Sequence, residues 1–166
     1  MKSERGGSRG QRREQLSDDP RHDSYKSRGK LQDPTRCPDC GATFRKGRWT
    51  WNGTGGAGAH EQVCPACQRI QDGYPAGYVA LSGEYFAAHR EEILNLVKNC
   101  EAKEKADHPL QRIMAIDEAE GGGVLVTTTD AHLARHIAEH IHDACKGSLA
   151  LQYNKEENLV RATWKR

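Results

Sequence analysis

The stretch that decides the first half of the fold runs from Cys37 to Arg69 and reads CPDCGATFRKGRWTWNGTGGAGAHEQVCPACQR. It holds four of the six cysteines, arranged as two Cys-x-x-Cys pairs with 23 residues between them. A two-residue gap lets both thiolates of a turn point at one ion, and two such pairs complete a structural zinc site. We therefore predict one structural Zn²⁺, bound by Cys37, Cys40, Cys64 and Cys67.

Two other uses of these cysteines compete with structural zinc. Thioredoxin-like redox proteins use one Cys-x-x-Cys pair at a helix start, whereas here there are two pairs, and the sequence places neither in a strand–helix unit. His60 could replace one ligand, but four thiolates already complete the set and leave no position for a catalytic water. The sequence carries no nucleophile–base pair, phosphate loop or dinucleotide motif. It therefore predicts a protein that is not an enzyme and has no small-molecule substrate.

Cationic and aromatic residues follow the first cysteine pair directly. Such residues in alternation can pair with phosphates and stack on bases. The competing interpretation is that the tryptophans fill the core of a very small module, and we expect one Trp to be structural and the other exposed. The predicted RNA contacts are Arg45, Lys46, Arg48, Trp49, Trp51, Arg69 and Arg135.

The charge of the chain is unevenly distributed. Residues 1–50 carry 13 Lys and Arg against 7 Asp and Glu, a surplus of +6, and residues 51–166 carry 12 against 16, a deficit of −4. An excess of basic residues in the N-terminal part indicates a polyanionic partner. Residues 1–33 are rich in Arg, Gly, Ser and Asp, so we expect a disordered tail, which either binds nucleic acid or only improves solubility.

Nothing in the sequence directs the chain to a membrane. No window approaches the roughly 18 apolar residues that a membrane span needs, and residues 1–15 lack the apolar region of a signal peptide. We expect a cytoplasmic protein that does not bind membranes. In that reducing compartment, paired cysteines favour a metal site over disulfides.

The second half is predicted to be an α+β domain. After a zinc ribbon over residues 34–75, residues 76–166 show the order strand, helix, strand, strand, helix, strand, strand, with two helices on one face of a largely antiparallel sheet. The expected helices cover 83–105 and about 130–146, the second ending at Gly147. The expected strands cover 78–81, 110–117, 124–128, 148–153 and 159–164.

Four of the eight histidines fall in the second predicted helix, DAHLARHIAEHIHDAC. His132, His136 and His140 are spaced by four residues, which can place ligands on successive helical turns. The sequence favours a solvated helix face, because the opposite face is an ordinary apolar stripe. A second metal site at this face, or RNA contacts made together with Arg135, are the alternatives.

Several short runs resemble one known family. These are Cys64-Pro-Ala-Cys67-Gln-Arg-Ile, Gly77-Tyr-Val-Ala-Leu, His89-Arg-Glu-Glu-Ile-Leu, Arg112-Ile, Gly123-Val, Thr129-Asp-Ala-His-Leu-Ala and Gln152-Tyr-Asn. Together they are similar to the large-ribosomal-subunit adaptor of archaea and eukaryotes, the nuclear export adaptor first named for nonsense-mediated decay. The chain also resembles an uncharacterised bacterial zinc-ribbon group. The family's further cysteine pairs, barrel domain and export signals have no counterpart in this sequence, so nuclear export is not expected.

The resemblance implies a compact protein that binds the ribosome or ribosomal RNA, with the large subunit favoured, in assembly, quality control or stress-time silencing. The residues and the resemblance together predict a non-enzymatic, zinc-containing RNA-binding protein. A zinc-ribbon regulator of transcription or of protein interactions is the alternative, and a metal-dependent enzyme is the third hypothesis.

Overall fold

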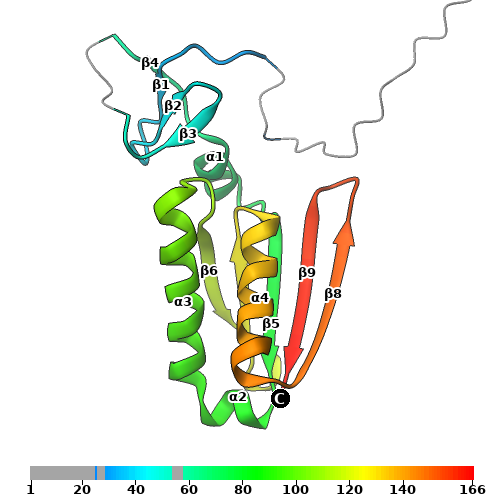
Figure 1. Cartoon of the computed structure of the whole chain (residues 1–166). Helices are drawn as coiled ribbons and strands as arrows, with labels where there is room; N and C mark the ends of the chain where they lie inside the picture. The colour runs from blue at the N-terminus through cyan, green and yellow to red at the C-terminus, as the bar shows by residue number, and fades with distance from the viewer. Residues whose placement is uncertain (1–24, 26–28, 54–57) are drawn as a thin grey trace, which may run out of the picture.

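A computed structural model describes Tyr25, residues 29–53 and residues 58–166. It contains two sheets together with helices, so the predicted mixture of helices and strands is confirmed. Most of the predicted tail, residues 1–24 and 26–28, lies outside the described residues. Figure 1 shows the small sheet above the larger α+β unit.

The small sheet is built from four short strands. They are β1 (Thr35–Arg36), β2 (Thr43–Arg45), β3 (Arg48–Thr50) and β4 (His60–Glu61), in the order β3-β2-β1-β4. The β2–β3 hairpin turns through Lys46 and Gly47, both at positive φ. Two successive residues at positive φ form the turn whose twist matches that of paired strands. The sequence supplies glycine at the second of these positions, where a left-handed conformation costs least.

The large sheet has five strands in the order β6-β7-β5-β9-β8. Only β5 and β9 run parallel, and the other neighbours are antiparallel. The strands are β5 (Gly77–Ser82), β6 (Ile113–Glu118), β7 (Val124–Thr128), β8 (Ser148–Asn154) and β9 (Leu159–Lys165). A 3₁₀ turn, η1 (Glu120–Gly122), joins β6 to β7.

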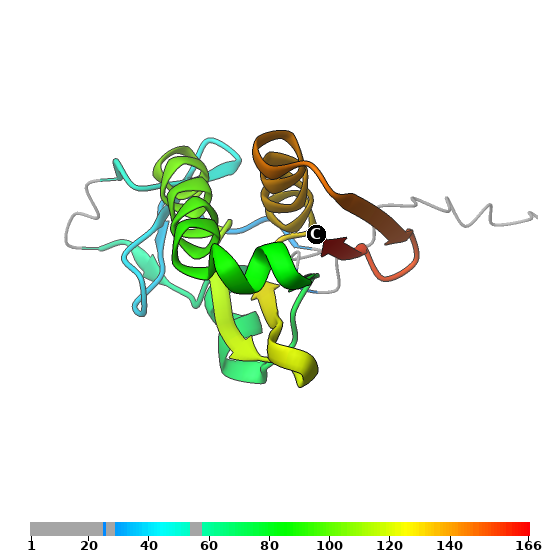
Figure 2. The ribbon, with the colours of Figure 1, turned by 90° about the horizontal axis from the view of Figure 1, so that it is seen from below.

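The helices α3 (Arg90–Asp107) and α4 (Ala131–Cys145) cover one face of this sheet, as Figure 2 shows. Alternate residues of β5, β7 and β9 point into the core between the two layers, because strand side chains alternate between faces. The largest fully buried side chains there include Trp164, Phe86, Leu81, Ile93 and Leu133. The indole N–H of Trp164 donates to the carbonyl of Lys146 (2.6 Å), so its one polar group is satisfied.

Three local predictions differ from the structure. The first predicted helix is divided into α2 (Glu84–Ala88) and α3, because His89 leaves helical geometry (φ −120°, ψ 26°) and its ring stacks on Tyr85 at 3.9 Å. The strand expected from Leu110 begins only at Ile113, since Leu110 packs against the cysteine cluster. Helix α1 (Pro65–Asp72) was not predicted from the sequence.

Among the described residues, no helix is both long and apolar enough to cross a membrane.

Candidate metal centre

The four predicted cysteines meet in one cluster. Their sulfur atoms all lie within 4.8 Å of one another, and the Sγ atoms of Cys40 and Cys64 are 3.7 Å apart. All six cysteines are free thiols. Within the described ranges, no other group of His, Cys, Asp or Glu side chains is assembled closely enough to hold a metal ion.

The first pair lies in a tight turn that follows β1. The N–H of Gly41 donates to the carbonyl of Cys37 (3.0 Å), and the N–H of Cys37 donates to the carbonyl of Ala42 (2.8 Å). Gly41 adopts φ 80°, a conformation that glycine reaches without strain. This closed turn brings Cys37 and Cys40 to the same side of the ribbon.

The second pair opens a helix, which corrects the expectation that neither pair belongs to a strand–helix unit. Cys64 is the N-cap of α1, Pro65 follows it in the first turn, and the N–H of Cys67 donates to the Cys64 sulfur at 3.4 Å. Proline suits this position because its missing N–H would have had no partner within the helix. The location is one that redox pairs also use. The metal site is favoured here because both pairs converge on a single cluster.

A buried arginine from the large domain completes the surroundings of the sulfurs. Nη2 of Arg112 lies 3.3 Å from the sulfur of Cys64 and 3.2 Å from that of Cys67. Arg112 directly precedes β6, and its backbone N–H donates to the hydroxyl oxygen of Thr129 (2.9 Å). The Thr129 hydroxyl in turn donates to the carbonyl of Leu110 (2.6 Å). The cluster is therefore tied to residues at the start of both β6 and α4.

The sulfurs differ in how readily they lose their protons. Burial raises the pKa of Cys64 and of Cys67, although for Cys67 the hydrogen bond from Arg112 opposes the rise. Burial also disfavours the thiolate of Cys37, but backbone N–H groups, first that of Cys64 (3.2 Å), lower its pKa to about 7. Burial would lower the pKa of Arg112, but the sulfurs of Cys67 and Cys64 raise it, so this side chain stays charged.

The cluster fits a tetrahedral zinc ion. Zinc–sulfur bonds of about 2.3 Å place the sulfurs of a tetrahedral site roughly 3.8 Å apart, close to the separation found for Cys40 and Cys64. Four thiolates and one Zn²⁺ carry a net charge of about −2, and the buried guanidinium of Arg112 offsets part of it. Such an ion would fix the ribbon against the large domain and would leave no ligand position for catalysis.

The predicted cations Arg45, Lys46 and Arg48 are all exposed and lie together at the β2–β3 hairpin. Arg45 and Arg48 are directly opposite each other across the two strands, and Lys46 occupies the turn. Asp33 lies beside them, because its carboxylate accepts the backbone N–H of Lys46 at 2.8 Å. The hairpin tip therefore presents three cations and one carboxylate.

The two predicted tryptophans are both half-buried, so neither is the freely exposed indole that the sequence led us to expect. Trp49 packs against the cysteine cluster and meets Phe44 edge-to-face, with ring centroids 5.7 Å apart. The indole N–H of Trp51 donates to the carbonyl of Lys105, in the last turn of α3, at 2.6 Å. Trp51 thus joins the ribbon to the large domain.

A groove borders Trp49 on the ribbon. It has a volume of about 530 Å³, and Phe44, Trp49, Arg48, Lys30 and Leu110 are among the residues that line it. Its walls combine aromatic rings with cationic side chains, the two kinds of group that bind nucleic-acid bases and phosphates.

The other two predicted RNA contacts lie elsewhere. Arg69 is only 2% exposed, and its guanidinium lies 4.3 Å from the ring of Tyr25 and donates to the carbonyl of Tyr74 (3.0 Å). We therefore remove Arg69 from the RNA-contacting set, since a buried cation cannot reach a phosphate. Arg135 is exposed on α4, where its Nε lies 2.8 Å from a carboxylate oxygen of Glu139.

The histidine face of α4 is largely solvated. His132, His136 and His140 are exposed, and Nδ1 of His136 lies 3.5 Å from a carboxylate oxygen of Glu104 on α3. His132 borders a different groove from His136 and His140. The structure therefore does not bring the three histidines together as the ligands of a second metal site.

The chain thus combines a small ribbon, whose four-cysteine cluster could hold a metal ion, with a larger unit of helices and a five-stranded sheet. A scan of protein-family models finds no match to the chain, and searches of curated proteins and of solved structures find none either. The resemblance to the ribosomal export adaptor stays a prediction.

Proposed function

We propose that the chain is a non-enzymatic, zinc-containing protein that binds RNA through its ribbon and acts at the ribosome. The observation that carries the proposal is the set of three exposed cations at the tip of the β2–β3 hairpin, whose Trp49 packs against the four-cysteine cluster. A rigid hairpin presents its charges without the ordering entropy that a flexible tail would lose on binding. The large subunit is the favoured location, on the resemblance alone.

The groove beside the hairpin supports a single-stranded RNA segment as the ligand. Phe44 and Trp49 present ring edges or faces there, and Arg48 belongs to both the groove and the hairpin tip. Phosphates bound at Arg45, Lys46 and Arg48 would leave adjoining bases near the aromatic wall. Stacking contributes about 1–3 kcal/mol per base and tolerates many sequences.

Fluorescence anisotropy with a labelled single-stranded RNA tests the proposal. If the protein makes three phosphate contacts, a plot of the logarithm of the association constant against the logarithm of the salt concentration should have a slope of about −2. The variant Arg45→Gln, Lys46→Asn, Arg48→Gln removes the three charges, and asparagine keeps the positive φ that Lys46 adopts. We expect its affinity at low salt to fall at least tenfold and its slope to approach zero.

A matched control neutralises three exposed lysines elsewhere, Lys98, Lys103 and Lys155, and changes the net charge by the same amount. An equal loss of affinity in both variants would assign binding to net charge and reject the hairpin as the binding site. Sedimentation with ribosomes through sucrose gradients, with and without nuclease, then tests the ribosomal location. A tagged wild-type chain that never enters the large-subunit fractions would reject that part of the proposal.

A further inference from the structure

The two edges of the large sheet differ in how they are protected. The edge strand β6 ends in Asp117 and Glu118, carries a register shift between Ile113 and Ala115, and binds Arg90 through Glu118. Charges and irregular pairing at an edge discourage another strand from adding there. Strand β8 has neither feature: SLALQYN, residues 148–154, contains no charged residue and no proline, and it pairs with β9 in unbroken register.

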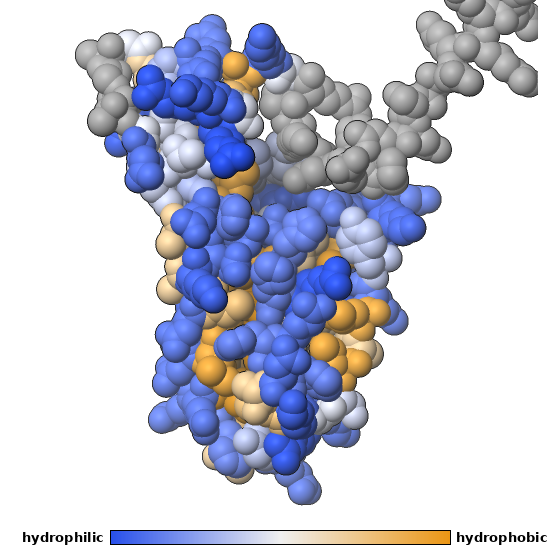
Figure 3. Space-filling view, in the orientation of Figure 1, coloured by the Kyte–Doolittle hydropathy of each residue, from blue (hydrophilic) through white to orange (hydrophobic). Residues whose placement is uncertain are grey.

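The unprotected strand also exposes large apolar side chains. Leu149, Leu151 and Tyr153 alternate along β8 and lie on the helix-covered face, because their partners on β9 are the core residues Trp164, Ala162 and Val160. Leu151 is 42% exposed and Tyr153 is 51% exposed, because β8 extends beyond the cover of α4. Figure 3 shows hydrophobic surface between α4 and the β8–β9 hairpin.

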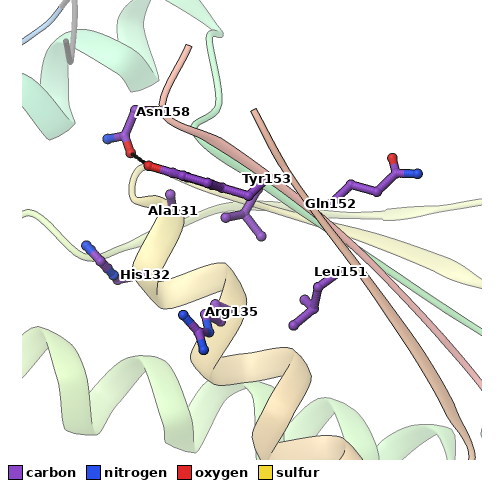
Figure 4. A pocket seen from close by; sticks show the side chains of 8 residues that line it. Ala131, His132, Arg135, Leu151, Gln152, Tyr153 and Asn158 are labelled. Carbon is purple, nitrogen blue, oxygen red and sulfur yellow. Dashed lines mark hydrogen bonds between the residues drawn. The ribbon is translucent and has the colours of Figure 1, made fainter. Parts of the chain in front are cut away.

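These side chains line a shallow groove of about 330 Å³ between α4 and β8. Figure 4 shows Leu151 and Tyr153 on the side of the hairpin that faces Ala131 and Arg135 of α4. The Tyr153 hydroxyl donates to the side-chain oxygen of Asn158 (2.9 Å), which holds the ring over the groove. Within the described residues, neither the strand's outer edge nor this groove is covered by another strand or helix.

We propose that β8 pairs antiparallel with β8 of a second copy of this chain, so that two five-stranded sheets join across a two-fold axis. Strand β8 is complementary to itself when the axis passes Leu151. In that register Leu151 lies opposite Leu151 of the second copy, Leu149 lies opposite Tyr153, and Ala150 lies opposite Gln152. All seven residues pair, and every large apolar side chain remains on the helix-covered face.

The charges at the strand ends favour the same register. Lys146 precedes the strand, and Lys155, Glu156 and Glu157 follow it with a net charge of −1. The two-fold axis brings Lys146, just before one strand, toward the acidic turn that follows the other strand, at both ends of the pair. If either strand is shifted by two residues from this register, only five of the seven residues of β8 remain paired. A second copy is therefore the occupant that this edge fits, since a two-fold interface uses one surface twice.

The experiment measures the mass of the zinc-loaded full-length chain by sedimentation equilibrium over a range of concentrations. We expect a mass that approaches twice 18.5 kDa. The variants Leu151→Lys and Leu151→Glu each place like charges on the axis, so each alone should be monomeric. Their equimolar mixture should recover the dimer, because the introduced lysine of one chain would then face the introduced glutamate of the other in the proposed register only.

The control variant Ile70→Lys charges another exposed apolar residue, on α1, and should leave the dimer intact. Circular dichroism melts verify that each variant folds. A wild-type chain that stays monomeric at about 100 µM, or a dimer that survives Leu151→Lys, would overturn the proposal and assign the edge to a different occupant. Failure of the Lys and Glu variants to form a heterodimer would overturn the register centred on Leu151.

Discussion

Removing the guanidinium of Arg112 should weaken zinc binding without weakening the metal-free fold. Nη2 of Arg112 lies within 3.3 Å of two sulfurs, and the side chain is 9% exposed. A hydrogen bond to a charged group contributes about 1.5–3 kcal/mol, and the two contacts share one nitrogen, so they are counted once. The variant Arg112→Met should therefore raise the dissociation constant for zinc by roughly 10–100-fold, the usual effect of losing a hydrogen bond to a metal ligand.

The metal-free protein should respond differently to the same substitution. Nε of Arg112 is buried without a hydrogen-bond partner, and without the ion the high pKa of the Cys64 and Cys67 thiols leaves less negative charge to balance the guanidinium. Replacing a buried charge by an apolar side chain of similar volume is often neutral or stabilising. We expect the melting temperature of the metal-free variant to equal or exceed that of the metal-free wild type.

Competition with a chromophoric zinc chelator gives the dissociation constants, and melts with and without a chelator give the two stabilities. Arg161→Met is the matched control, because Arg161 is exposed on β9 and stacks on Tyr78 at 4.4 Å. Its zinc affinity should be that of the wild type. Unchanged zinc affinity in Arg112→Met, or equal losses of stability with and without metal, would refute the reasoning.

Two further predictions follow from the metal centre and its contacts. Zinc affinity should rise by at least a hundredfold per pH unit between pH 6 and 8, because the raised pKa values of Cys64 and Cys67 mean that binding must release both protons. The slope should be steeper below pH 7, where Cys37, with a pKa of about 7, also releases a proton on binding. Chelator competition at several pH values measures this, and a pH-independent affinity would contradict it. Trp51→Phe should lower the free energy of unfolding by about 1 kcal/mol, since it removes the hydrogen bond to Lys105. Denaturant titration measures the change, and an unaltered midpoint would show that the contact does not stabilise the fold.

Much of the large domain could be predicted because its signals are local. Val124–Thr128, rich in β-branched residues, lies between a glycine run and the cap of the next helix, and β7 has those bounds. Asp130 caps α4 through the N–H of Leu133 (3.0 Å), as Ser, Thr, Asn and Asp do at helix starts. Lys146 and Gly147 both adopt positive φ after that helix, where the sequence placed its end at the glycine.

What the sequence could not show depends on contacts between distant residues. No proline or glycine marks the break at His89, which depends on the packing of α2 against the last residue: the N–H groups of Tyr85 and Phe86 both donate to the carbonyl of Arg166. Leu110 has the apolar character of a strand residue, but its partners are cysteines of the ribbon. Periodicity reports which residues prefer burial and does not report what they are buried against.

The candidate metal site likewise combines features that the sequence reveals with contacts that it does not. Spacing alone identified the four cysteines, because ligands of one turn are neighbours in sequence. Arg112 lies 45 and 48 residues from the sulfurs it contacts, and a lone arginine before a strand carries no signal for such a role. Tyr25 falls within the predicted tail, yet its hydroxyl donates to Asp72 at 2.9 Å and its ring lies beside Arg69.

These long-range contacts affect which ligands the cations of the β2–β3 hairpin could bind. Arg112 links the sulfurs to the start of β6, Trp51 links the loop after β3 to the end of α3, and Leu110 packs against the cluster. A ribbon on a free linker would need none of them, and it could meet phosphates in any orientation. Fixing Arg45, Lys46 and Arg48 relative to the sheet restricts the phosphate arrangements that all three can contact at once. If the hairpin binds single-stranded RNA as proposed, this restriction would favour backbone conformations whose phosphates match the three cations, which net charge alone cannot do.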